Sequence, residues 1–242
     1  MLTVYLTAVK EKESGKYKAG LWVRDSSAGI GTLTFYSPAT NLVCGLGHGI
    51  CDEDTGKLLK LDSGEIISAE IYEVVKGEVG NPGQLKGRFT GEVLGEICLN
   101  CDGGIYSNFK NPKTNYTLTE VAAKSSVKNG KAKVLCTIDQ SGPKYYDCTI
   151  TVKKSNINAP TQNMMITVTD NRLLDKTGGI VQGLSGSPVL QNGKLVGAVT
   201  HVLIDEPTKG YAIFAENMLE TAQFVGNDLR VVPQKQQLKD AS

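Results

Sequence analysis

Runs in which apolar and polar residues alternate recur along most of the chain, and a period of two predicts β-strands. The runs cover residues 2–9, 19–25, 29–36, 65–75, 95–99, 131–138, 146–153, 164–170, 187–191 and 194–204. Turn-forming residues separate these runs at short intervals, and glycine is abundant, with 27 copies. Many short strands separated by frequent turns are typical of a β-barrel or a β-sandwich.

Two local patterns refine this all-β prediction. Asn192–Gly193 lies between the last two runs and predicts a type I′ hairpin, because both central residues of that turn need a positive φ. Asn129–Gly130 is a second Asn-Gly pair between strand-like runs. Residues 214–225 place apolar side chains along one helical face and predict a short C-terminal helix.

The domain organisation is expected to be a single domain over residues 1–242, with two β-barrel sub-domains that meet near 100–120. That stretch is rich in turn-forming and polar residues and predicts a loop. No internal repeat is visible in the sequence.

Charge and hydropathy narrow the function classes. Lys and Arg number 26 and Asp and Glu number 25, so the formal net charge is only +1. A net charge this small gives the protein no overall positive potential that would attract nucleic acid, so we expect no nucleic-acid partner. No apolar run approaches the roughly 20 residues that a membrane-spanning helix needs. The first twelve residues lack the basic segment and apolar block of a signal peptide.

The six cysteines leave several interpretations open. Cys98 and Cys101 form one C-x-x-C pair, but a structural zinc site needs a second pair at similar spacing. Buried free thiols are the simplest interpretation. Cys136 and Cys148 lie on consecutive strand-like runs and could instead form a disulfide. We expect no metal site and no cofactor.

The segment "GLSGSP" at residues 183–188 carries the strongest chemical signal. A serine hydroxyl needs a base within hydrogen-bond reach and N–H donors where a carbonyl oxygen becomes negative. Glycines at Gly183 and Gly186 permit a turn that can direct the N–H groups of Gly183 and Ser185 at one oxyanion. Ser185 is the preferred nucleophile, and Ser187, which precedes a proline, is the alternative.

The base must be one of the two histidines, since no other side chain titrates suitably near neutral pH. His48 lies between two glycines in a loop and is preferred over His201, which lies within a strand-like run. A carboxylate that orients the imidazole completes such a site. The candidates are Asp170, Asp175, Asp102 and Asp52, and Asp170 is preferred because it follows an apolar strand.

Several segments resemble the stage IV sporulation protein B peptidase family. They are "AGIGTLTFY", "GLGHGI", "KGEVGNPGQLKG", "VTDNRLLDKTGGIVQGLSGSPVLQNGKLVGAVTHV" and "DEPTKGYAIFAENML", in order between about residues 19 and 222. The resemblance implies a serine endopeptidase with a chymotrypsin-like double β-barrel and a short C-terminal helix. It implies the catalytic residues His48, Asp170 and Ser185, and an oxyanion hole at Gly183 and Ser185.

The sequence departs from the pattern in two respects. Digestive relatives of this fold carry Asp immediately before the serine, where this chain has Leu184. Family members carry an N-terminal membrane anchor and a PDZ module, and we find neither in these residues. The chain is therefore expected to be an isolated protease domain whose full-length protein is membrane-anchored.

The resemblance also implies a role in endospore formation. Such a protease would work outside the cytoplasm, in the space between the two membranes around the forespore. It would cleave itself and a regulatory protein that restrains an intramembrane protease, and so activate a late sigma factor. The alternative is a non-catalytic module that binds a peptide on the same fold.

Overall fold

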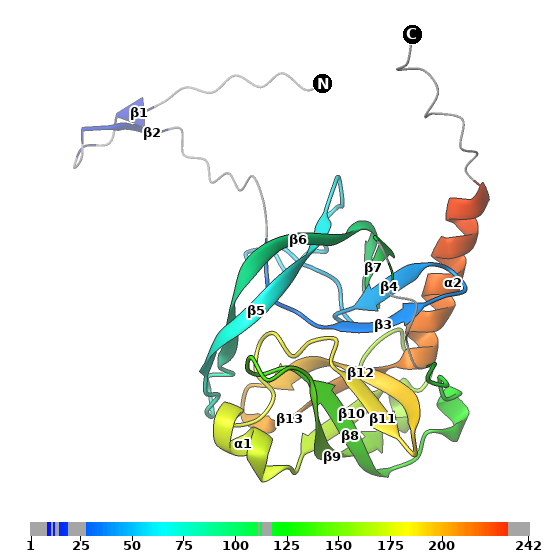
Figure 1. The fold of residues 1–242 in the computed structure, drawn as a ribbon. Coiled ribbons are helices and arrows are strands. Elements are labelled where there is room, and N and C mark those ends of the chain that lie inside the picture. The colour runs from blue at the N-terminus through cyan, green and yellow to red at the C-terminus, as the bar shows by residue number, and fades with distance from the viewer. Residues whose placement is uncertain are drawn as a thin grey trace.

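The computed structural model describes residues 9–10, 12, 15–18, 28–110, 112 and 118–231. A small hairpin joins two short strands near the N-terminus, β1 (Val9–Lys10) and β2 (Tyr17–Lys18). The main body has two successive β units, one above the other in Figure 1. Each unit is antiparallel throughout.

The first unit is a five-stranded sheet in the order β3-β4-β7-β6-β5. Its strands are β3 (Leu33–Ser37), β4 (Leu42–Gly45), β5 (Glu65–Val75), β6 (Gln84–Cys101) and β7 (Gly104–Phe109). β5 and β6 form a long bent hairpin that arches over the shorter strands in Figure 1. Register shifts within this hairpin allow it to bend, because extra residues increase the local twist.

The second unit is a closed six-stranded barrel in the order β10-β13-β12-β11-β8-β9. Its strands are β8 (Gly130–Cys136), β9 (Lys144–Val152), β10 (Met164–Val168), β11 (Pro188–Gln191), β12 (Lys194–Leu203) and β13 (Glu206–Phe214). Two 3₁₀ turns, η1 (Lys124–Ser126) and η2 (Lys154–Asn156), and the short helix α1 (Asn171–Thr177) lie in the connections. The chain continues into helix α2 (Ala215–Val231).

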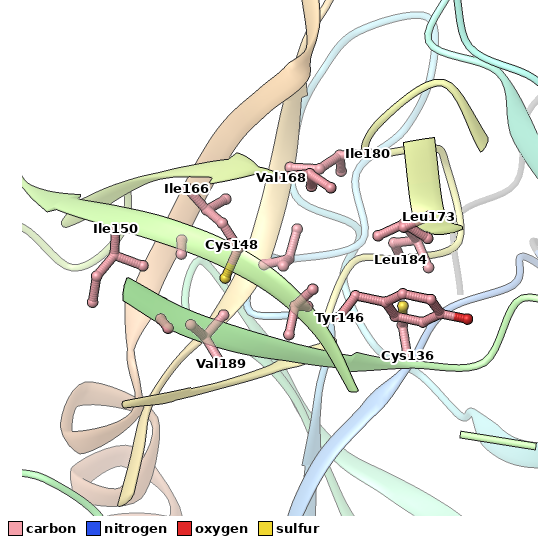
Figure 2. Close-up of a cluster of buried hydrophobic side chains, with 14 of the residues drawn as sticks. Cys136, Tyr146, Cys148, Ile150, Ile166, Val168, Leu173, Ile180, Leu184 and Val189 are labelled. Carbon is pink, nitrogen blue, oxygen red and sulfur yellow. The ribbon is translucent and has the colours of Figure 1, made fainter. Parts of the chain in front are cut away.

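The barrel core forms because alternate side chains of its strands point inward. On β9, Tyr146, Cys148 and Ile150 are buried while Asp147 between them is exposed. Figure 2 shows these side chains packed with residues of β10, β11 and α1. Leu184, which immediately precedes the candidate nucleophile, lies in the same cluster and is 2% exposed. The serine loop is therefore anchored to the barrel by its own neighbour.

A second buried cluster joins the two units through α2. Met218, Ala222 and Val225 recur at helical spacing along one face of α2 and are buried. They pack with residues of the first sheet and of the barrel: Leu42, Cys44 and Tyr106 from the former, Ala198 and Ile213 from the latter. Figure 1 shows α2 running alongside both units. The helix thereby helps to fix the relative position of the two units.

The structure confirms the all-β prediction with two β units and a C-terminal helix. The strands predicted at 65–75, 131–138, 146–153, 164–170, 187–191 and 194–204 appear with ends shifted by at most two residues. Asn192 and Gly193 have φ values of 52° and 77°, which confirms the type I′ prediction. The run at 19–25 and most of the run at 2–9 lie outside the described residues.

The loop predicted at 100–120 is wrong for residues 104–109, which form β7. This strand is short and contains Gly and Ser, but it pairs with β4 on one side and β6 on the other. The strands β4 and β13 and the helix α1 were also not predicted. The first sheet ends at Phe109, and the barrel begins at Gly130.

Within the described residues, no helix combines the length and the hydropathy needed to span a bilayer.

Candidate active site

The serine loop connects α1 to β11 and exposes only one of its two serines. Ser187 is fully buried, with 0% exposure, whereas Ser185 remains half-buried. Gly183 and Gly186 have φ values of 99° and 90°, which favour glycine. A Cβ at Gly186 would lie 2.0 Å from the Thr32 carbonyl oxygen, so the backbones approach each other closely here. Accessibility therefore favours Ser185 over Ser187 as the nucleophile.

The backbone N–H groups around Ser185 fall into two sets. Those of Gln182, Leu184, Gly186 and Ser187 donate to backbone carbonyls at 2.8–3.2 Å. For the N–H groups of Gly183 and Ser185, no acceptor is recorded among the described residues. These two are the predicted oxyanion donors, and they are the ones left available to a ligand.

The peptide groups that carry these two donors are held by their own carbonyls. The Gln182 carbonyl, in the same peptide plane as the Gly183 N–H, accepts from Leu85 N at 2.8 Å. The Leu184 carbonyl, in the plane of the Ser185 N–H, accepts from Ser187 N at 3.0 Å. Because a peptide group is planar, fixing its C=O also fixes its N–H. The first unit thus helps to orient the Gly183 donor through β6.

The Ser185 hydroxyl donates to the Thr200 carbonyl oxygen at 2.7 Å. Thr200 lies where the β12–β13 register shifts, between the pairs Val199–Ala212 and His201–Tyr211. An extra residue at such a bulge is left out of the ladder, which frees its carbonyl for another donor. The bulge also explains why Val199 and Thr200 are both buried while the next residue, His201, is exposed.

His48 follows β4 in the loop that crosses onto the barrel. A Cβ at Gly47 would lie 2.9 Å from the Ile213 side chain and 3.0 Å from the Thr200 methyl group, so only glycine fits against these strands. The His48 ring packs against His201 with 4.7 Å between ring centroids. Its Nδ1 lies 2.8 Å from the Gly49 carbonyl oxygen. Partial desolvation of its ring, and secondly the nearby His48, lower the pKa of His201.

The candidate base and the candidate nucleophile therefore come from different units, and both contact the same segment of β12. Ser185 binds the carbonyl of Thr200, and the loop of His48 packs on the Thr200 side chain and on His201. No hydrogen bond between His48 and Ser185 is recorded among the described residues. The Ser185 hydroxyl must leave Thr200 before it can donate to an imidazole.

Two threonines near β3 connect the first unit to the serine loop. Thr32 donates its N–H to the Ser185 carbonyl at 2.8 Å, and its own carbonyl accepts from Leu46 N at 3.2 Å. The Thr34 hydroxyl is buried and donates to the Gly186 carbonyl at 2.8 Å. Thr32 therefore connects Ser185 to Leu46, two positions before His48. Sequence reasoning missed both threonines, because threonine in a strand carries no distinctive signal.

Asp170 is buried but lies at the end of the barrel, where it caps α1. One carboxylate oxygen accepts from Arg172 N and Nε at 2.9 and 3.0 Å. The other accepts from Arg172 Nη2 at 2.7 Å and from Asp147 N at 3.1 Å. The hydrogen bonds from the Arg172 side chain hold the pKa of this carboxyl well below its usual range. The structure does not bring Asp170 into contact with His48.

The strand register shows where Asp170 lies along β10 relative to His201. Met165 on β10 pairs with Tyr211, which in turn pairs with His201 beside His48. Asp170 lies five residues further along the chain from Met165, which corresponds to about 16 Å of extended backbone. The catalytic role of Asp170 therefore stays a prediction from the resemblance, and the recorded partners of its carboxylate are structural.

The other aspartates and the cysteines have simpler surroundings. Asp175 is exposed on α1, and Asp52 accepts from the N–H and the hydroxyl of Thr55. Asp102 is exposed in the turn between β6 and β7.

All six cysteines are free, so Cys136 and Cys148 form no disulfide. No group of three or more metal-ligating side chains is found within the described part of the chain.

The family comparison covers most of the chain. The model of the SpoIVB peptidase S55 family matches residues 15–219, including the segments of His48 and Ser185. The chain belongs to the SpoIVB peptidase S55 family. This membership confirms the predicted family and, at the coarse level, a serine peptidase. A comparison with curated protein sequences gives no significant match.

Solved structures resemble this S55 peptidase only distantly. The HtrA-type protease AlgW with a decapeptide is 17% identical, with a TM-score of 0.39 over 66% of this chain and 50% of that one. A mutant of human heparin binding protein (CAP37) is 11% identical, with a TM-score of 0.39 over 77% and 75%. An inactive serine-to-alanine mutant of Rv3671c from M. tuberculosis is 12% identical, with a TM-score of 0.37 over 84% and 99%. The chain thus spans half the length of the AlgW chain.

Proposed function

We propose that the chain is a serine endopeptidase in which Ser185 is the nucleophile and His48 the general base. The observation that carries the proposal is the pair of available N–H groups at Gly183 and Ser185 beside an accessible hydroxyl, while the neighbouring N–H groups are all engaged. A tight turn with no chemical role has no need to leave two such donors without acceptors. Membership of a peptidase family supports the same reaction.

The tautomer of His48 fits the role of base. A neutral imidazole that donates its Nδ1–H to the Gly49 carbonyl has an unprotonated Nε2, which accepts a proton. When the Ser185 hydroxyl turns from Thr200 to Nε2, its oxygen can attack a peptide carbonyl as its proton passes to the imidazole. The N–H groups of Gly183 and Ser185 then stabilise the negative oxygen of the tetrahedral intermediate.

The second half of the reaction returns the proton. The imidazolium gives it to the leaving amine, which breaks the C–N bond and leaves an acyl group on Ser185. A water molecule, deprotonated by the same Nε2, hydrolyses this ester and restores the free hydroxyl. We include Asp170 as the carboxylate that the resemblance predicts, although its oxygens would have to release Arg172 and Asp147 N to reach the imidazole.

We propose further that the substrates are the chain itself and a regulatory protein of an intramembrane protease pathway that activates a late sigma factor. The family name supports a sporulation role. The site of action would be the space between the two forespore membranes, with the full-length protein held at a membrane. Incubation of the purified chain at several concentrations, followed by mass spectrometry of the fragments, tests self-cleavage.

A fluorophosphonate probe tests the mechanism without knowledge of the substrate. It should label Ser185 covalently in the wild-type protein and should fail to label Ser185→Ala or His48→Ala. Ser187→Ala is the matched control, because that serine is buried, and it should be labelled. Labelling of Ser187 instead would make that serine the nucleophile. No labelling of the folded wild-type protein would leave the non-catalytic binding module as the better function.

A further inference from the structure

The two histidines of the chain lie in contact at the candidate active site. They are the only histidines in the sequence, and they come from different units, His48 from the loop after β4 and His201 from β12. Their ring centroids are 4.7 Å apart, and the ring planes are tilted by 38°. No hydrogen bond between the two rings is recorded among the described residues. The fold thus gathers every imidazole of the chain at one point.

The spacing of the two rings matches that of imidazoles that share a metal ion. Imidazole is the commonest metal ligand among side chains. In tetrahedral zinc sites the Zn–N bond is about 2.0–2.1 Å, so two imidazoles on one ion have ring centroids about 5 Å apart. The observed 4.7 Å is close to this value. Rotation of the two side chains can therefore direct a nitrogen of each ring at one ion while the backbone stays in place.

Each ring has a nitrogen available for such a bond. His48 Nδ1 lies 2.8 Å from the Gly49 carbonyl oxygen, and donation of Nδ1–H to it leaves the lone pair of Nε2 free. Histidines that bind metals usually donate their other N–H to an oxygen in this way. No hydrogen bond of the His201 ring is recorded among the described residues, and His201 is exposed, so an ion can approach from solvent.

The backbones that carry the two rings are held by the barrel. His201 lies within β12 and pairs with Tyr211 of β13. The loop of His48 packs closely on the barrel at Gly47, where a Cβ would lie 2.9 Å from the Ile213 side chain and 3.0 Å from the Thr200 methyl group. Ligands carried by rigid elements keep the spacing that an ion requires.

The number of ligands indicates how an ion is held. In the described part of the chain, no third histidine, cysteine, aspartate or glutamate joins the pair. A resident catalytic zinc ion has three protein ligands and a structural one has four. Two imidazoles completed by water therefore suit reversible binding of a divalent ion that favours imidazole, such as Zn²⁺. Sequence analysis predicted no metal site, because the two histidines lie far apart in the chain.

We propose that His48 and His201 together form a reversible inhibitory site for Zn²⁺, an inference that rests on the proposed function above. The ion takes up the Nε2 lone pair through which His48 would accept the proton of Ser185. With that lone pair in a metal–nitrogen bond, the Ser185 hydroxyl keeps its proton and its hydrogen bond to the Thr200 carbonyl. Zinc thereby holds the peptidase inactive until a stronger chelator removes the ion.

The first test measures the rate of fluorophosphonate labelling at Ser185 in a chain without a histidine tag, at neutral pH and increasing Zn²⁺. At a zinc concentration about ten times the Kd the rate should fall about tenfold, because only about a tenth of the protein is then free of metal. Excess EDTA should restore the rate. Mg²⁺ should have no effect, since it prefers oxygen ligands. A labelling rate that is independent of zinc would overturn the proposal.

Two variants show which side chains hold the ion, each compared with its own metal-free rate. His201→Gln should raise the zinc concentration for half-inhibition by about tenfold or more, because even the loss of an outer-shell partner typically costs about 10–100-fold in metal affinity. Cys51→Ser is the matched control, since it removes an exposed free thiol that could also bind zinc, and it should keep the wild-type response. Unchanged zinc sensitivity in His201→Gln, or a lost response in Cys51→Ser, would contradict the assignment.

A binding measurement keeps the metal site separate from the catalytic proposal. With only two histidines in the chain, the imidazole NMR spectrum has two sets of ring signals, and His201→Gln assigns them. In Ser185→Ala, zinc should shift both sets and reach saturation at one ion per chain. A shift of one ring alone, or of neither, would rule out the shared site. If both rings shift but the metal-free wild type is not labelled at Ser185, the metal site stands and the proposed function fails.

Discussion

The hydrogen bond from Thr34 to the serine loop offers a direct measure of how the first unit supports the nucleophile. The Thr34 side chain is 7% exposed, and its hydroxyl donates to the Gly186 carbonyl at 2.8 Å. No other donor to this carbonyl is recorded among the described residues. In Thr34→Val a methyl group replaces the hydroxyl at nearly constant volume, so the carbonyl loses its partner without a cavity. Thr34→Ser keeps the hydroxyl and loses only the methyl group.

The magnitudes separate the two variants. A hydrogen bond contributes about 0.5–1.5 kcal/mol net, and a buried group left unsatisfied costs about 1–3 kcal/mol, so about 2 kcal/mol is expected for Thr34→Val. In a domain of this size each kcal/mol shifts the melting temperature by about 2–4 °C, so the midpoint should fall by about 4–8 °C. Loss of one buried methyl group in Thr34→Ser costs about 0.8 kcal/mol, a smaller shift.

Thermal unfolding followed by circular dichroism measures the stability, and the rate of fluorophosphonate labelling measures the nucleophile. Since the serine loop depends on this contact for its position, Thr34→Val should also be labelled more slowly, by about tenfold or more. Thr34→Ser should be labelled at nearly the wild-type rate. If Thr34→Val proves as stable as Thr34→Ser, the hydrogen bond between the units contributes nothing and this reasoning is refuted.

Three further predictions concern single positions. Gly186→Ala should abolish labelling and strongly destabilise the protein, because the φ of Gly186 is 90° and the added Cβ would lie 2.0 Å from the Thr32 carbonyl oxygen. Gly142→Ala is the control for backbone strain alone, because Gly142 has a φ of 82° and a Cβ there would meet no atom within 4 Å. The folded pKa of Asp170 is lowered, so its charge stabilises the wild type above the unfolded carboxyl pKa of about 4, and this stabilisation is lost as pH falls. The free energy of unfolding of Asp170→Asn, measured in urea from neutral to acidic pH, should therefore fall less steeply than that of the wild type. The same pH dependence in both proteins would contradict this. Because the pKa of His201 is lowered in the folded state, the unfolded state binds the proton first as pH falls below about 6.5, and the wild type loses stability. In urea titrations over the same pH range, the free energy of unfolding of His201→Gln should fall less than that of the wild type.

Local patterns correctly predicted the backbone around the candidate site. The glycine-rich serine loop and the tight hairpin after it follow from backbone conformations that only a few residues adopt, so they could be read from the sequence. The accessibility of Ser185 relative to Ser187 could not be read, because it depends on which side of the loop the barrel covers. The catalytic roles of His48 and Ser185 stay predictions until labelling is measured.

The choice among the candidate carboxylates could not be made from local sequence patterns. Asp170 follows an apolar strand, as a buried acidic residue of a triad would, but the same pattern describes the N-cap of a short helix. Only the positions of Arg172 and Asp147 distinguish the two interpretations. Asp102 lies in a stretch that the sequence predicted as a loop, and the structure places it in the turn between β6 and β7.

The sequence by itself determined the strands with clear alternation, the type I′ turn, the C-terminal helix and the family, since each depends on neighbouring residues or on a continuous motif. The tertiary structure alone decided which distant segments meet. The bulge that frees the Thr200 carbonyl, the contact of His48 with His201, and the bonds from Thr32 to the serine loop all join residues far apart in the chain. Such contacts follow from strand pairing and close packing between the two units, which no local pattern of side chains specifies.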